Sequence, residues 1–308
     1  MILWVSTMVV LLTTLYLELI GSVTDRSGIV ALHTCSVETN ITVVTAFIDI
    51  GTFIKGTTIR TTQDYTSWFY SWGKLLQPVV FYYNKRWIYE QFRQVRGDLP
   101  TKYMFVNLFN ESEGRSWMIL KTARKIFAQK GYPKHHPPTT NPPYVVIMHA
   151  KYDMLEEAVD SDYFKTECTM WLDLGLFREY KSSSCFVLKH PPNFDPSKIA
   201  FNKVHELKTN KSSEWIIKNM PHWVCGGTIL GKNHIIKKFV HQYRRTTDSL
   251  LARNLIGDDQ MTIYSMFSDA TLNTDLNVKI QTYEGRVRES PDPWFYLGYL
   301  MKHSKMCG

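Results

Sequence analysis

Runs of β-branched and aromatic residues alternate with segments of helical periodicity along most of this chain. The clearest runs are ITVVTAFIDI at 41–50, VVFYY at 79–83 and KYMFVN at 102–107. Continuous apolar runs of this length are typical of strands that are buried on both faces. Segments with helical spacing separate or follow the runs, at 64–76, 86–95, 116–130, 144–158, 233–255 and 258–268. This alternation predicts an α/β fold with a mostly parallel sheet and helices on both of its faces.

Later patterns complete the predicted domain. Further strands are expected at 169–174 (TMWLDL), 223–231 (WVCGGTILG, a strand and a turn) and 277–283 (NVKIQTY). Asp64 is the expected N-cap of the helix at 64–76. The proline-rich stretch at 131–143 predicts a loop, because helix and strand patterns resume directly after it. We therefore expect a single domain at 41–300, with 301–308 as a C-terminal tail.

The first residues, MILWVSTMVVLLTTLYLELI, are almost wholly apolar, with Glu18 the only acidic side chain among them. The densest apolar run, 8–17, matches the core of a signal peptide, and Ser22 offers a small residue for cleavage. The stretch also approaches the roughly 20 apolar residues of an uncleaved type II membrane anchor. Both readings place the chain in the secretory pathway, either in the ER or Golgi lumen or secreted. Residues 1–24 are the expected signal or anchor and the only expected membrane contact, and 25–40 are a linker.

Three Asn-x-Ser/Thr triplets agree with a secretory compartment. They begin at Asn40, Asn110 and Asn210, and each matches the acceptor pattern for N-glycosylation. Asn210 lies in a polar stretch and is the best candidate, whereas Asn40 leads straight into an apolar strand pattern. The sequence therefore predicts a glycoprotein.

The cysteines suit the same compartment. The chain has five of them, Cys35, Cys168, Cys185, Cys225 and Cys307, and none forms a CxxC pair, which argues against a zinc ribbon or a thioredoxin-like motif. In an oxidising lumen one or two disulfides are expected, and Cys168 with Cys185 is the favoured pair. The alternative is that Cys168 and Cys225 are small buried residues.

Basic residues outnumber acidic ones, and the net charge is +8. The excess is spread over helical segments such as 121–130 and 237–245, which is typical of solvated helix faces. The alternative is attraction of an anionic ligand such as a nucleotide or a phosphate. Nucleic acid is not an expected partner in a secretory compartment.

Several common catalytic motifs are absent from the sequence, which has no GxSxG, GxGxxG or HExxH pattern. GGTILGKN at 226–233 approaches the phosphate-binding loop GxxxxGK[ST], but Asn233 stands where that loop needs a hydroxyl for Mg²⁺. A phosphate-binding hydrolase is therefore the weakest interpretation. Gly226, Gly227 and Gly231 provide either close approach of the backbone to a ligand or a tight turn and close packing.

Carboxylates follow two predicted strands and open one predicted helix. Asp49 and Asp173 come at the ends of strand patterns, where open α/β sheets bind ligands. Asp173 either coordinates a divalent ion that carries a diphosphate or caps the following turn. Asp258 and Asp259 are either capping residues or a base that accepts a proton from an attacking hydroxyl. Lys151 either neutralises a phosphate or is solvated.

Taken in order, these segments resemble the HtrL/YibB family. The matching motifs are TVVTAFIDIG at 42–51, WLDLG at 171–175, GGTILG at 226–231 and DDQ at 258–260, with Lys151 shortly before the second of them. The resemblance covers most of the chain after the apolar segment. Bacterial members are associated by name with lipopolysaccharide core gene clusters, and related sequences occur in animals.

The family pattern is similar to that of GT-A-type glycosyltransferases, so the resemblance implies a GT-A-like (Rossmann-like) fold. It implies that Asp49 lies near the uridine or ribose of a donor, and that Asp173 lies near a metal ion. Mn²⁺ is the implied cofactor. Gly226 and Gly227 would lie beside the donor sugar.

The implied activity is transfer of a sugar from a nucleotide-sugar donor to a hydroxyl of a glycan or glycoprotein. Asp258 or Asp259 would be the base near that hydroxyl. The chain departs from the D-x-D pattern of such enzymes at its second acid, where it has Gly175. This departure supports the alternative function, a non-catalytic secreted pseudo-enzyme that binds a glycan or a nucleotide-sugar.

Overall fold

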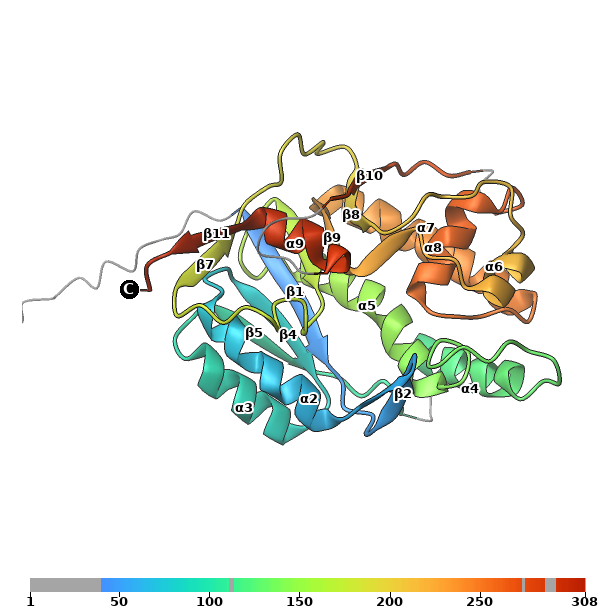
Figure 1. The fold of residues 1–308 in the computed structure, drawn as a ribbon, viewed down its shortest axis with the longest axis horizontal. Coiled ribbons are helices and arrows are strands. Elements are labelled where there is room, and N and C mark those ends of the chain that lie inside the picture. Colours follow the sequence, from blue (N-terminus) through green and yellow to red (C-terminus); the bar gives the residue numbers. More distant parts are fainter. Residues whose placement is uncertain (1–39, 111–113, 273–274, 286–291, 308) are drawn as a thin grey trace, which may run out of the picture. The chain divides into compact units, whose positions relative to one another are not determined.

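A seven-stranded sheet runs through the described chain in the order β10-β8-β9-β6-β1-β4-β5 (Figure 1). The computed structural model describes residues 40–110, 114–272, 275–285 and 292–307. The predicted signal or anchor at 1–24 lies outside these ranges, as does the linker up to residue 39. No helix within the described ranges is long and apolar enough to cross a bilayer.

The strands of the sheet are β1 Ile41–Phe47, β4 Val79–Tyr83, β5 Thr101–Phe105, β6 Cys168–Leu172, β8 Ile199–Lys203, β9 Val224–Lys232 and β10 Ile280–Tyr283. Neighbours are parallel except at β9, which is antiparallel to both β6 and β8. The expected mostly parallel sheet is therefore confirmed. The turn expected within 223–231 is wrong, because Val224–Lys232 is the strand β9. It pairs with β6 from Thr228 onward and with β8 on either side of a register shift at Gly226–Thr228.

Helices cover both faces of the sheet. They are α2 Thr62–Ser67, α3 Arg86–Arg96, α4 Arg115–Phe127, α5 Pro142–Ser161, α6 Ser213–Asn219, α7 Asn233–Ala252, α8 Asp259–Ser268 and α9 Tyr296–Met301, with 3-10 helices at Trp68–Lys74 and Pro293–Phe295. Alternate strand residues face opposite layers. Val43 and Leu172 pack with α3, α9 and the first 3-10 helix, whereas Val44 and Trp171 pack with α5, α7 and α8.

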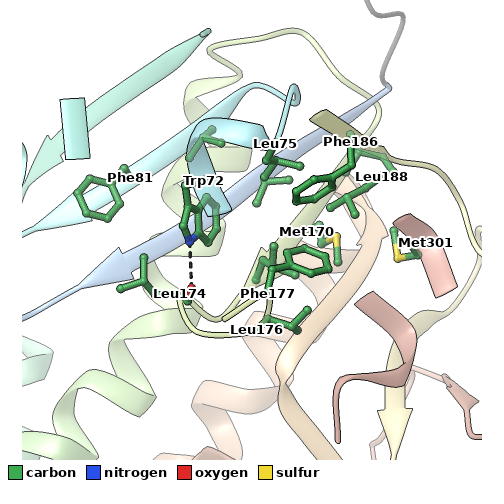
Figure 2. Packing of buried hydrophobic residues seen from close by; sticks show 14 of the residues in the cluster. Trp72, Leu75, Phe81, Met170, Leu174, Leu176, Phe177, Phe186, Leu188 and Met301 are labelled. Carbon is green, nitrogen blue, oxygen red and sulfur yellow. Dashed lines mark hydrogen bonds between the residues drawn. The ribbon is translucent and has the colours of Figure 1, made fainter. Parts of the chain in front are cut away.

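The segment that follows β6 is anchored in the first of these layers (Figure 2). The indole nitrogen Nε1 of Trp72 donates a hydrogen bond to the carbonyl of Leu174 at 2.9 Å, and Phe177 is buried nearby. On the other side, the amide of Asp173 donates to the carbonyl of Gly227 at 2.8 Å. The backbone of Asp173 is therefore fixed at the strand end.

The helix expected at 64–76 begins earlier and ends sooner. Thr61, rather than Asp64, is the N-cap, and Asp64 accepts hydrogen bonds from the Thr61 backbone and hydroxyl. This reciprocal capping box fixes the start of α2. After Ser67 the aromatic run continues as the 3-10 helix Trp68–Lys74.

Two small sheets that the sequence analysis missed complete the fold, namely β2 Phe53–Lys55 with β3 Thr58–Arg60, and β7 Cys185–Leu188 with β11 Lys302–Lys305. The residues expected as a C-terminal tail thus contain a strand that pairs with β7. A disulfide between Cys185 and Cys307 joins the same two segments. The favoured pair Cys168–Cys185 is wrong, since Cys168 lies in the central sheet and Cys185 in a separate one. Cys168 and Cys225 are buried free cysteines, as the alternative reading predicts.

Candidate active site

A cleft of about 480 Å³ opens at the carboxyl ends of β1 and β6. Residues from α5, β9, the start of α8, the β2–β3 hairpin and the first 3-10 helix also line it. All seven residues that the sequence singles out lie in this lining, namely Asp49, Lys151, Asp173, Gly226, Gly227, Asp258 and Asp259. The structure therefore brings the candidate residues together, while their roles stay predictions.

Lys151 is a buried cation in the cleft wall. Its side chain is 1% exposed, and its Nζ donates to Asp259 Oδ2 at 2.7 Å and to the carbonyl of Gly226 at 2.8 Å. Nζ also lies 5.4 Å from the centre of the Trp171 ring. Burial by itself lowers the pKa of Lys151, but the carboxylates of Asp259 and Asp173 raise it above its ordinary value. The reading of Lys151 as a solvated side chain is wrong.

Asp259 is held by two protein donors at one of its oxygens. Its Oδ2 accepts hydrogen bonds from Lys151 and from the Tyr152 hydroxyl at 3.1 Å. Gly226 leaves the space for this carboxylate, because a Cβ at Gly226 would overlap Asp259 Oδ2 and lie 3.2 Å from Lys151 Nζ. Gly226 thus allows a buried ion pair to lie against the strand, which agrees with the close-packing alternative for this glycine.

Asp258 differs from its neighbour. It is the N-cap of α8, its Oδ1 accepts from the amide of Met261 at 3.0 Å, and it is 4% exposed. Burial and the negative charge of Asp259 raise the pKa of Asp258 to about 7. A carboxyl with such a pKa exchanges protons near neutral pH, as a general base must. We refer to Lys151, Gly226, Asp258 and Asp259 as the floor of the cleft.

His149 positions this floor, and the sequence analysis missed it. Its Nε2 lies 3.1 Å from the carbonyl of Gly257, directly before Asp258, and its Nδ1 lies 2.7 Å from the hydroxyl of Tyr243. The carbonyl requires a proton on Nε2, so Nδ1 accepts from the tyrosine. Burial lowers the pKa of His149 to about 4, which keeps the ring neutral. In the sequence, His149 lies three residues before Tyr152, which places both on one face of the helix. This spacing is the signal that could have pointed to His149.

Asp49 is held at the end of β1. Its carboxylate accepts from Lys85 Nζ at 2.8 Å, from the Thr62 hydroxyl at 2.8 Å and from the amide of Gly51 at 2.9 Å. Burial alone would raise the pKa of Asp49, but these hydrogen bonds lower it below its ordinary value. Asp49 is therefore an anion at neutral pH that orders the rim of the cleft around β1.

Asp173 is a half-exposed acid in the lining of the cleft. Its side chain is 49% exposed, its Oδ1 accepts from Trp171 Nε1 at 2.7 Å, and Lys151 Nζ lies 3.9 Å away. A Cβ at Gly227 would lie 3.2 Å from Asp173 Oδ2, so this glycine leaves room for the acid. Asp173 therefore faces the cleft half exposed, whereas Asp259 is buried and paired with Lys151.

The acids of the cleft do not fit the manganese site that the family resemblance implies. Within the described ranges no group of three or more His, Cys, Asp or Glu side chains is arranged to hold a metal ion. Asp173 stands alone at its strand end, and Asp259 is committed to Lys151. A Cβ at Gly175 would lie 2.5 Å from the Trp68 ring, so packing excludes the second acid of D-x-D.

Two arginines of the cleft were missed from the sequence. Arg60 at the end of β3 and Arg178 in the segment after β6 both lie over the ring of Trp68, with Cζ at 5.7 and 5.5 Å from its centre. All three residues line the cleft. We refer to Arg60, Trp68, Asp173 and Arg178 as the mouth of the cleft.

Residues 39–274 match the model of the HtrL_YibB family, which is described as a bacterial protein of unknown function. This chain belongs to the HtrL_YibB family. The matched range contains every floor and mouth residue. Protein HtrL of Escherichia coli (strain K12) is 23% identical over 238 residues, which cover 72% of this chain and 82% of that protein.

Two solved structures of glycosyl-group synthases or transferases show a distant likeness to this HtrL_YibB chain. Mouse xyloside xylosyltransferase 1, in its apo form, has a TM-score of 0.37 at 10% identity, over 79% of this chain and 85% of that chain. Core-mannan synthase A from Aspergillus fumigatus, in an Mn/GDP form, has a TM-score of 0.43 at 9% identity, over 80% and 73%. A likeness with TM-scores of 0.37 and 0.43 identifies no ligand of this chain.

Proposed function

We propose that this protein is a glycosyltransferase that moves a sugar from a nucleotide-sugar donor to a hydroxyl of a glycan or glycoprotein. The observation that carries the proposal is the unequal pair of acids in the floor of the cleft. Asp259 is neutralised by Lys151, while Asp258 has no cation within salt-bridge distance among the described residues and a pKa of about 7. Environments that separate two neighbouring carboxyls in this way are typical of acid–base sites.

Asp258 and Asp259 have different roles in the inverting sugar transfer that we propose. Asp258, as carboxylate, accepts the proton of the acceptor hydroxyl. The acceptor oxygen then forms a bond to the anomeric carbon of the donor. The bond from that carbon to the diphosphate oxygen breaks, and the nucleoside diphosphate leaves with the electron pair. Burial, together with the charge of Asp259, keeps the pKa of Asp258 high enough to accept the proton.

We place this reaction in the lumen of the secretory pathway. The apolar segment at 1–20 and the Asn-x-Ser/Thr triplet at Asn210, which is exposed, support this compartment. The disulfide between Cys185 and Cys307 gives further support, because disulfides persist in oxidising compartments. Whether the segment is cleaved or remains as an anchor would be tested by looking for Met1 on the mature protein.

A panel of nucleotide-sugars tests the activity. We expect the full chain, purified from a secretory host, to release nucleoside diphosphate from at least one donor. Asp258→Asn should lower the rate by about 10²–10⁴-fold, which is the usual contribution of a general base. Asp98→Asn, at an exposed position, is the matched control and should leave the rate unchanged. Failure of every nucleotide-sugar to bind would refute the proposal.

The second candidate is a pseudo-enzyme that binds a nucleotide-sugar without turnover. The replacement of the second D-x-D acid by Gly175 favours it. Calorimetric binding of a donor, with no release of nucleoside diphosphate under any condition tested, would decide for this candidate. If the wild type and Asp258→Asn release nucleoside diphosphate at equal rates, the transferase proposal stands, but Asp258 is not the general base.

A further inference from the structure

The mouth of the cleft carries cations that the fold holds beside an aromatic ring. Arg60 and Arg178 come from segments more than a hundred residues apart in sequence, yet both guanidinium groups lie over the Trp68 indole. Arg178 also lies over Phe295, with Cζ 4.4 Å from the ring centre. Stacking of this kind restricts a long side chain without using its N–H donors.

The donors of these arginines remain largely free for a ligand. Within the described ranges, the side chain of Arg60 has no carboxylate within 4.0 Å and makes no hydrogen bond; only its backbone pairs, in the β2–β3 hairpin. Arg178 donates only a long bond of 3.3 Å to the carbonyl of Gly175, and its nearest carboxylates, Glu179 and Asp292, lie at 3.9 and 4.0 Å. By contrast, the floor cation Lys151 has two partners within 2.8 Å.

Trp68 stands where the metal-binding acid would have to be. Its ring contacts Gly175 so closely that an aspartate there would displace it. Gly175 thus occupies the sequence position of the second D-x-D acid, and the Trp68 indole fills the space beside it. Two guanidinium groups in turn lie over this indole. The charge that a bound cation would bring to this strand end is supplied by side chains.

We infer that Arg60 and Arg178, held over Trp68, bind the diphosphate of the donor without a divalent cation. The inference rests on the proposed function for its ligand class. A planar guanidinium matches the non-bridging oxygens of a phosphate through two parallel hydrogen bonds, and two such groups match a diphosphate. The exposed carboxylate of Asp173 then faces the sugar hydroxyls, where it accepts hydrogen bonds.

The burial and charges around Tyr65 agree with this arrangement. Tyr65 lines the cleft next to Trp68, with ring centres 4.8 Å apart. Burial and the charge of Asp173 raise the pKa of Tyr65 to about 12, whereas Arg60 and Arg178 oppose the shift. The acid and both arginines therefore all lie near enough to Tyr65 to affect its ionisation.

Calorimetry with UDP and GDP as probes, in EDTA and separately in Mn²⁺, tests the inference. We expect one of these nucleoside diphosphates to bind equally well in both buffers, and its monophosphate to bind at least tenfold more weakly. Arg60→Gln and Arg178→Gln should each weaken binding by about 10- to 100-fold, as expected for loss of a charged hydrogen-bonding partner. Arg86→Gln, at a highly exposed position, is the matched control and should bind like the wild type.

The outcomes separate this inference from the proposed function. Binding that needs Mn²⁺ and ignores both arginines would overturn the inference and leave the transferase proposal standing. Binding of neither probe, together with failure of all nucleotide-sugars, would overturn both. Arg60→Lys provides a variant that keeps the charge on an exposed hairpin, so folding is preserved. It should bind more weakly than the wild type in EDTA, because lysine lacks the planar fork.

Discussion

The floor and the mouth of the cleft hold charges in opposite ways. In the floor, Lys151 and Asp259 are about 1% exposed and form an ion pair, with further hydrogen bonds from Tyr152 to Asp259 and from Lys151 to the strand backbone. In the mouth, Asp173 is half exposed, and both arginines lie over the Trp68 ring, with no carboxylate of the described residues closer than 3.9 Å to either guanidinium. The difference indicates that the fold organises the floor by itself, whereas the mouth is left for a ligand to complete. Variants of the floor should therefore change stability, and variants of the mouth should change binding.

Lys151→Met should have the largest effect. It leaves Asp259 as a buried carboxylate without its cation, and breaking a buried pair in this way typically costs about 3–5 kcal/mol. Urea unfolding would measure the loss, with Lys121→Met on the exposed surface of α4 as the matched control. A loss below about 1 kcal/mol would mean that the floor is not held together by this pair.

Asp258→Asn should stabilise the protein at high pH while removing its activity. In the folded protein the pKa of Asp258 rises from 3.8 to about 7, so its stabilising protonation is complete below about pH 4 and is lost as the pH rises through 7. Asparagine caps a helix equally well and does not ionise. The gain of the variant over the wild type should therefore grow from near zero at pH 4 to on the order of 4 kcal/mol at pH 8.

Unfolding of both proteins in urea from pH 4 to pH 8 measures this gain, with Asp98→Asn as the control. A difference between Asp258→Asn and the wild type that does not vary with pH would show that Asp258 is an ordinary carboxylate. The floor would then contain two equivalent acids, and the proposed difference between Asp258 and Asp259 would be refuted.

Gly226→Ala should be intermediate. The added Cβ overlaps the carboxylate of Asp259, which cannot move without breaking its bond to Lys151, and overpacking of this kind costs about 1–3 kcal/mol. Gly227→Ala is the matched control from the same strand. Its Cβ would lie 3.2 Å from the half-exposed carboxylate of Asp173, which can turn away. Equal losses in thermal or urea unfolding would contradict the contrast between floor and mouth.

Arg60→Gln should have the smallest effect on stability. Its side chain has no carboxylate partner within the described ranges, and such surface changes stay within about 0.5 kcal/mol. The same variant should nevertheless lose nucleoside diphosphate binding. A stability loss as large as that of Gly226→Ala would show that the guanidinium supports the hairpin rather than a ligand.

The sequence predicted the sheet and the floor better than the mouth. The strands β1, β4 and β6 are continuous β-branched and apolar runs, and Asp49 and Asp173, at the ends of β1 and β6, follow the rule that sheets bind ligands there. The segment at 223–231 was harder, because glycine is unfavourable in strands and its pairing with β6 and β8 is a long-range contact. The expected turn was wrong for this reason.

The mouth depends on contacts that no local pattern contains. Arg60, Trp68 and Arg178 meet only after a hairpin, a 3-10 helix and the segment after β6 have packed together. The disulfide has the same property, since Cys185 and Cys307 are 122 residues apart and join a two-stranded sheet that has weak strand patterns. Gly175 was noticed as a missing acid, but its packing against Trp68 required the structure.

The dependence of kcat/KM on pH, measured for sugar transfer by the wild type, tests the role of Asp258 most directly. Because the free enzyme must present Asp258 as a carboxylate, the account predicts that kcat/KM rises with pH and reaches half of its maximum near pH 7. In Asp258→Asn this rise should be absent and the residual rate low. A wild-type profile that is flat from pH 5 to pH 8, or a rise that persists in Asp258→Asn, would contradict it.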